Sequence, residues 1–155
     1  MSALPASRLM AWALTALLCG SAAAQGAAAA RARTNFIHHC TGCHLIDGSG
    51  SPAKGIPSMR GLLGQFLQVP GGREFIVQVP GVMNSPLADR DIAELMNWLL
   101  PYVAHATTPP GTAPYTAAEI ARLRTSRPLD VAAARQRLMA QMRSAGIVTP
   151  PTGAE

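Results

Sequence analysis

The chain has 155 residues, enough for one domain with extensions, and its 13 basic and 8 acidic side chains give a formal net charge of +5. Residues 32–104 carry five charges of each sign, so most of the excess lies from His105 onward, where six arginines stand against three acidic residues. These arginines are not interleaved with aromatic residues, which speaks against a nucleic-acid partner, and we expect them to form a solvated helix face rather than a docking patch.

The first 24 residues have the three parts of a secretory signal peptide: a positively charged start, an apolar core at residues 9–18 and a small-residue cleavage site at residues 22–24. The apolar run is too short to span a bilayer. Cys19 follows leucines rather than the small residue expected before a lipidated cysteine. We therefore expect cleavage before Gln25 and a soluble periplasmic product. The alanine-rich residues 25–31 are expected to be a disordered lead-in.

Residues 40–44 read Cys-Thr-Gly-Cys-His, which is the attachment pattern of c-type haem. In this chemistry the thiols of Cys40 and Cys43 add across the two vinyl groups of one haem and become thioethers. Two intervening residues allow one turn of backbone to present both sulfurs to the same porphyrin edge. His44 follows directly, so its imidazole can reach the iron as the proximal ligand. The pattern therefore predicts one covalent haem c.

Two other uses of a Cys-x-x-Cys pair fit the sequence less well. A closed zinc site needs four ligands, and His38, His39 and His105 form no second ligand pair at zinc-site spacing. A thioredoxin-like dithiol requires a neighbouring βαβ unit, and the sequence around the motif shows no such unit. Once the signal peptide is removed, the haem would use both remaining cysteines and leave no disulfide.

The apolar pattern of the following segments predicts an all-α chain. A first helix is expected from near Thr34 or Asn35, both suitable N-caps, into the haem motif. A loop rich in Gly, Ser and Pro follows at residues 47–55. Short helices are expected at residues 62–69 and 73–79, each closed by a Pro-Gly pair. The second could be read as a strand, but an isolated strand has no partner here.

Residues 87–100 form the clearest predicted helix. Pro101 is expected to end it, since the residue before a proline avoids helical geometry. Its apolar residues recur at helical spacing and form one stripe: Ile92, Leu95, Met96, Leu99 and Leu100.

The C-terminal part is predicted to hold two further helices. Residues 105–114 are Pro-rich and are expected to be a linker. Thr116 and Glu119 form a capping box that opens a short helix ending at Arg124. Residues 129–144 predict another helix.

These expectations divide the chain after the lead-in. Residues 32–104 form the haem domain, and residues 105–114 link it to a helical extension at residues 115–145. Residues 146–155 are expected to be a disordered tail. The Pro-rich linker and the change in charge predict that the haem domain folds without the extension.

The landmarks within residues 32–104 resemble the class I c-type cytochromes. In that family a small residue and an aromatic on the first helix contact an aliphatic and an aromatic residue on the last. Ala32 and Phe36 match the first pair here, and Leu95 and Trp98 match the second. The resemblance implies an all-α cytochrome c fold wrapped around one haem, with the C-terminal extension lying outside it.

Residues 57–61, Pro-Ser-Met-Arg-Gly, resemble the family's P-x-L-x-G segment. There the proline carbonyl accepts a hydrogen bond from the proximal histidine, a role that the resemblance assigns to Pro57. Met59 replaces the aliphatic residue and is expected to pack in the haem pocket. Its use as the sixth iron ligand remains the alternative.

Met83 lies in a segment that resembles the family's distal methionine loop, at about the family's interval before Trp98. The resemblance therefore implies Met83 as the sixth iron ligand. The chain departs from the family in two places. Ala88 stands where a capping serine is common, and the stretch between Pro57 and Met83 is short.

The resemblance implies a periplasmic single-electron carrier with histidine and methionine ligands, not an enzyme, whose partners are periplasmic redox proteins. Two alternatives remain open. In the first alternative, the chain is a dedicated haem subunit of a periplasmic dehydrogenase, with the extension docked on the larger subunit. In the second, it is a haem enzyme or gas sensor with an open sixth position. His105 could approach the haem only if the linker folds back.

Overall fold

The computed structural model describes residues 24–147 of the chain. The expected signal peptide therefore lies almost wholly outside the described residues, as does most of the expected tail. Within them the regular structure is helical apart from one isolated bridge between Ser51 and Ile56, which confirms the all-α prediction. An N-terminal helix at residues 24–39 is followed by η1 (Pro52–Lys54), α2 (Leu62–Phe66), α3 (Gly72–Gln78), α4 (Pro80–Met83), α5 (Asp89–Ala104), α6 (Ala117–Arg124) and α7 (Val131–Ser144).

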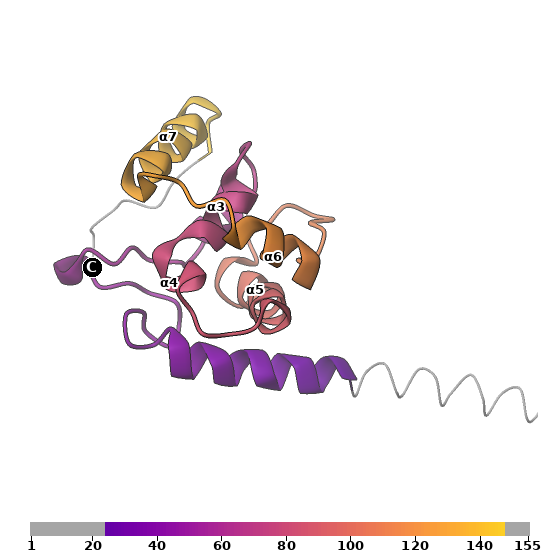
Figure 1. Ribbon diagram of the computed structural model, residues 1–155. Helices are drawn as coiled ribbons and strands as arrows, with labels where there is room; N and C mark the ends of the chain where they lie inside the picture. The colour runs from indigo at the N-terminus through magenta and orange to yellow at the C-terminus, as the bar shows by residue number, and fades with distance from the viewer. Residues whose placement is uncertain (1–23, 148–155) are drawn as a thin grey trace, which may run out of the picture.

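The N-terminal helix begins earlier than the sequence predicted. Residues 25–31, expected to be disordered, are helical, because alanine is the strongest helix former and the segment also has a partner. Arg31 forms an ion pair with Glu94 of α5 at 2.9 Å. Figure 1 shows this helix crossing α5, which is seen nearly end-on above it. Ala32 and Phe36 are fully buried there.

The long helix α5 carries the predicted stripe, but Pro101 does not end it. Three more residues follow the proline within the helix. Pro101 removes only the hydrogen bond to the Asn97 carbonyl, and tertiary contacts hold the last turn. The Gly61 N–H donates to the Val103 carbonyl at 2.8 Å, and Ala104 is buried. The predicted stripe is buried throughout: Ile92, Leu95, Met96, Leu99 and Leu100.

Two short helices, α2 and α3, form where the sequence predicted them. The corner between them depends on Gly72, since any Cβ there would overlap the carbonyl oxygen of Phe66. The close approach brings the rings of Phe66 and Phe75 to 5.2 Å between centroids. Both rings are buried in the core that underlies the haem motif.

The C-terminal extension forms both predicted helices but is not separate from the rest. Thr116 caps α6 by accepting a hydrogen bond from the Glu119 N–H, which confirms the capping box. Asp130 caps α7 in the same way. Side chains of the extension share one hydrophobic cluster with Phe36 and α5, namely Tyr115, Ile120, Leu123, Ala134, Leu138, Met139 and Met142. The expectation that residues 32–104 fold alone therefore conflicts with this packing.

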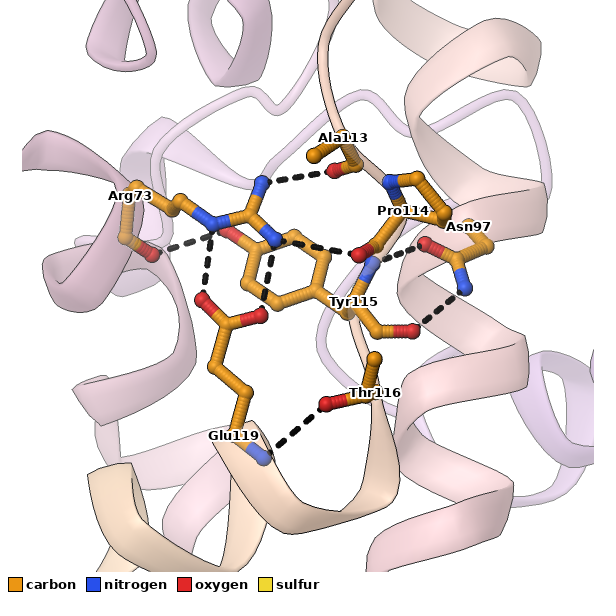
Figure 2. Close-up of polar contacts among 7 residues, drawn as sticks. All are labelled: Arg73, Asn97, Ala113, Pro114, Tyr115, Thr116 and Glu119. Atoms are coloured by element: carbon orange, nitrogen blue, oxygen red, sulfur yellow. Dashed lines mark hydrogen bonds and ion pairs between the residues drawn. The ribbon is translucent and has the colours of Figure 1, made fainter.

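Arg73 of α3 joins the extension to the rest of the core (Figure 2). Its guanidinium donates two hydrogen bonds to the Glu119 carboxylate, at 2.7 and 2.8 Å. It also donates to the carbonyls of Ala113 and Pro114, at 2.8 and 3.3 Å. The guanidinium carbon lies 3.9 Å from the centre of the Tyr115 ring. The expected linker is thus fastened along its last residues.

Tyr115 is buried beside Arg73 and forms hydrogen bonds to both α3 and α5. Its N–H donates to the Asn97 side-chain oxygen at 2.7 Å, and the Asn97 amide donates to its carbonyl at 2.9 Å. Its hydroxyl donates to the Arg73 carbonyl at 2.8 Å. Burial raises the pKa of this phenol. Because each polar group has a partner, the ring is buried without an unpaired donor or acceptor.

A chain ending at Pro110 should lose cooperative unfolding. It would lack Ile120, Leu123 and Met142, each fully buried and each contributing about 1.5–3 kcal/mol. A domain of this size has a total stability of only about 5–15 kcal/mol. Denaturant unfolding followed by circular dichroism measures the effect, with a chain ending at Ile147 as the control. A sharp transition at the control's midpoint would show that the extension is dispensable.

The Arg73–Glu119 pair should make stability depend on acid pH. The hydrogen bonds from Arg73 hold the pKa of Glu119 below its ordinary value of 4.5. The unfolded chain therefore binds the proton first. The contribution, about 1–2 kcal/mol for a partly exposed charged pair, is complete above that value and is lost as pH falls through the lowered pKa.

The difference in unfolding free energy between the native chain and Glu119→Gln should accordingly shrink between neutral and acid pH. The Arg73→Gln background is the control, because Glu119→Gln should add no such pH dependence where the partner is already gone. A difference that stays constant with pH would contradict the assignment.

Candidate haem-binding site

The motif at residues 40–44 forms a turn at the end of the N-terminal helix. The Cys40 N–H donates to the Phe36 carbonyl at 2.9 Å, so the helical bonding reaches the first cysteine. The N–H groups of Cys43 and His44 then both donate to the Cys40 carbonyl, at 3.1 and 3.0 Å. The two cysteines and the histidine are therefore held on one turn whose position is set by the buried Phe36.

The two thiols lie in different surroundings. Cys40 is half-buried and packs against the hydrophobic core, and this burial, with a smaller contribution from Cys43, raises the pKa of its thiol to about 11. Cys43 is exposed, and neither of these two cysteines forms a disulfide. A group attached to both sulfurs would have one side against the core and one edge open to solvent.

His44 carries a buried nitrogen with an unmet hydrogen-bonding capacity. Its Nδ1 has no hydrogen-bond partner among the described residues, Pro57 included. Burial lowers the pKa of the imidazole, which favours the neutral form that a metal ligand requires. A buried polar atom without a partner costs free energy, and this one belongs to the residue that the haem motif assigns to iron. The residues present therefore fit a covalently attached haem.

Pro57 and Met59 lie in the loop that follows the motif. Pro57 is exposed, whereas Met59 is half-buried and packs against the core cluster. The Met59 N–H donates to the Gly48 carbonyl at 2.9 Å. Gly48 has φ +84, and a Cβ there would collide with Val103 of α5, so this glycine allows the loop to lie against the helix. The packing role expected for Met59 is compatible with this position.

Met83 is the last residue of α4 rather than part of an irregular loop. Pro80 occupies the first turn of this short helix, where its fixed φ is suitable. The N–H groups of Val82 and Met83 both donate to the Val79 carbonyl at 3.0 Å. Met83 is partly exposed, and a short segment without helix or strand leads from it to α5. Ala88 precedes α5 without a side-chain cap, as the sequence predicted.

The remaining histidines lie away from the core. His38 and His39, on the N-terminal helix, and His105, after α5, are all exposed. Among residues 24–147 no three His, Cys, Asp or Glu side chains are grouped so that they could hold a metal ion. The cysteine pair thus gains no further ligand of these types from the described part of the chain.

Two curated relatives are similar to this chain, and both are named cytochrome c-552. The one from Thermus thermophilus is 31% identical over 119 residues, which span 64% of this chain and 90% of the relative. The second, from a named strain of the same species, is 31% identical over 119 residues, spanning 64% of this chain and 80% of the relative. The chain belongs to the c-type cytochromes.

Membership of this family makes the cofactor a haem c and the chain an electron carrier. No family model and no solved structure matches the chain. Over residues 24–147, no helix has both the length and the apolar character needed to cross a membrane.

The sequence interpretation missed Arg124. The arginines of the extension were expected to form a solvated face, but Arg124 is only 24% exposed and bonds to the segment that follows Met83. A signal was present in the sequence. Arg124 follows Ile120 by one helical turn and Leu123 directly, so it lies beside the apolar face of α6 that packs into the core.

Proposed function

We propose that the protein is a periplasmic monohaem c-type cytochrome that carries single electrons, in which His44 and Met83 would hold the iron. The observation that carries the proposal is the turn at residues 40–44 in a member of this family. It presents Cys40, Cys43 and a buried, unpaired His44 nitrogen from one short segment. Haem iron, when bound, supplies a one-electron couple between the ferrous and ferric states.

The residues of the chain would fix the cofactor and set its preference between the two states. Cys40 and Cys43 would hold it covalently, and His44 would provide a neutral imidazole. A thioether from Met83 is soft and favours the ferrous state. The apolar core beside Cys40 disfavours the additional positive charge of the ferric state. Both effects raise the reduction potential, and no proton need move.

The surface around the motif suits brief contact with redox partners. Cys43 is exposed, and the next apolar residues, Leu45 and Ile46, are 61% and 47% exposed. An open cofactor edge beside apolar side chains would let a periplasmic donor or acceptor approach without a large interface. Such contacts are typical of small, weak electron-transfer encounters.

The two alternative functions, a dehydrogenase subunit and a haem enzyme or gas sensor, are judged by different observations. The extension was the reason to consider a dehydrogenase subunit, and its helices pack on this chain's own core instead of presenting a free docking element. An enzyme or sensor with an open sixth position is decided by the ligand count at the iron. The substitution of Met83 described below tests it directly.

The haem should remain on the polypeptide when the exported protein is extracted with acidified organic solvent. The two thioethers are covalent, so intact-mass analysis should give residues 25–155 plus one haem. Single Cys40→Ala and Cys43→Ala variants should retain haem through one bond, while the double variant should release it. Colour that leaves the unchanged polypeptide, or a lipid-bearing mass that includes Cys19, would contradict the respective part of the proposal.

Met83→Leu should abolish the weak far-red sulfur-to-iron(III) absorption, lower the potential and let carbon monoxide bind the ferrous iron. Leucine roughly keeps the volume and removes the sulfur. Met59→Leu is the matched control and should leave all three largely unchanged, because Met59 packs against the core. The reverse pattern would assign the ligand to Met59. No effect from either would indicate His105 or an open sixth position.

A further inference from the structure

Arg124, the last residue of α6, binds the backbone that follows Met83. Its Nη2 donates to the carbonyls of Met83 and Ser85, at 3.3 and 2.8 Å. Its Nη1 donates to the Leu87 carbonyl at 3.0 Å and to the Asp89 carboxylate at 2.9 Å. One guanidinium from the extension therefore has all four of these acceptors within residues 83–89, where α4 ends and α5 begins.

The three backbone acceptors are alternate residues, and the carbonyls of Met83, Ser85 and Leu87 all reach the same side chain. Residues 85–88 belong to no helix or strand, so their backbone groups need partners from elsewhere. Arginine suits this use because its planar fork offers several fixed donors from one charge. Hydrogen bonds from a charged donor are also stronger than neutral ones.

Arg124 is itself held by a rigid element. Ile120 and Leu123 on the same helix are 0% and 1% exposed, and Thr116 caps its first turn. The side chain also spans the junction with α5, because Asp89 is the first residue of that helix. Ala88 provides no cap at this junction. The contact with Arg124 therefore fixes the start of α5 and the end of α4 to the same point of the extension.

We infer that Arg124 is a positioning residue for the sixth iron ligand: it holds the backbone of Met83 so that the thioether stays in place, and its loss increases the fraction of molecules with the ligand detached. The inference rests on the proposed ligation by Met83. It gives the extension a role at the iron in addition to its place in the core.

A purely structural role for Arg124, fastening the extension, is separable from this one. Arg73 also fastens the extension, through Glu119 and the carbonyls of Ala113 and Pro114. None of these acceptors lies in residues 83–89. Arg73→Gln therefore loosens the extension at a different place and is the matched control for Arg124→Gln.

The test measures imidazole binding to the ferric, full-length haem protein, followed by loss of the far-red sulfur band, beside denaturant unfolding of each variant. Imidazole must displace the methionine, so its apparent affinity follows the fraction of molecules with the ligand detached. We expect Arg124→Gln to bind imidazole about tenfold more tightly. Arg124→Lys should lie between, because one ammonium cannot span four acceptors. Arg73→Gln should stay within about twofold of the native affinity at a similar loss of stability.

Equal tightening in the two glutamine variants, in proportion to their loss of stability, would overturn the inference and leave Arg124 as a fastener of the extension. An unchanged affinity in Arg124→Gln would also overturn it. If Arg124→Gln does not fold, Arg124→Lys decides by the same titration, compared with Arg73→Lys. Failure of the proposed ligation is recognised separately, because the native protein would then either lack the sulfur band or keep it in Met83→Leu.

Discussion

The packing of the N-terminal helix against α5 is the contact on which the haem motif depends. Phe36 is fully buried, and its ring lies 5.7 Å from that of Trp98. Such an aromatic pair adds about 0.5–1.5 kcal/mol beyond the area that it buries. Ala32, one turn earlier, is small enough for the two helices to approach closely. Because the Cys40 N–H bonds to the Phe36 carbonyl, the anchored ring also determines where the cysteine turn begins and which sulfur lies against the core.

Two arginines explain how a polar segment becomes part of the same core. A partly buried guanidinium is tolerated only when its charge and its donors have partners. Arg73 meets this condition with one carboxylate and two carbonyls, and its hydrogen bonds to the Glu119 carboxylate raise its pKa. Arg124 meets it with one carboxylate and three carbonyls. The same type of side chain therefore fastens the extension at two places, one beside α3 and one between α4 and α5.

Local signals in the sequence predicted the elements, and tertiary contacts decided where they end and what they touch. The capping box at Thr116 and the apolar stripe of α5 are local, and both are confirmed. Pro101 was wrongly expected to end α5, because the bond from Gly61 that holds the last turn joins residues far apart in the chain. The Pro-rich segment before Tyr115 wrongly suggested that the haem domain folds on its own, because its partner Arg73 on α3 is distant in sequence. The haem motif was recognisable because its chemistry needs only five consecutive residues, whereas the role of Arg124 required the folded arrangement.

An electron carrier keeps its iron ligand more securely when the backbone of the ligating residue is held in place, in addition to the bond between ligand and iron. The thioether bond is weak enough that a competing ligand can replace it when the chain segment moves away. Movement of the Met83 segment requires the carbonyls of residues 83, 85 and 87 to leave one guanidinium together, because all three bind the same rigid group. Detachment is then cooperative, and a partial displacement gains little conformational entropy while losing charged hydrogen bonds. Under the proposed ligation by Met83, the extension would restrict the iron to one set of ligands in both oxidation states and would keep the structural change that accompanies each electron small.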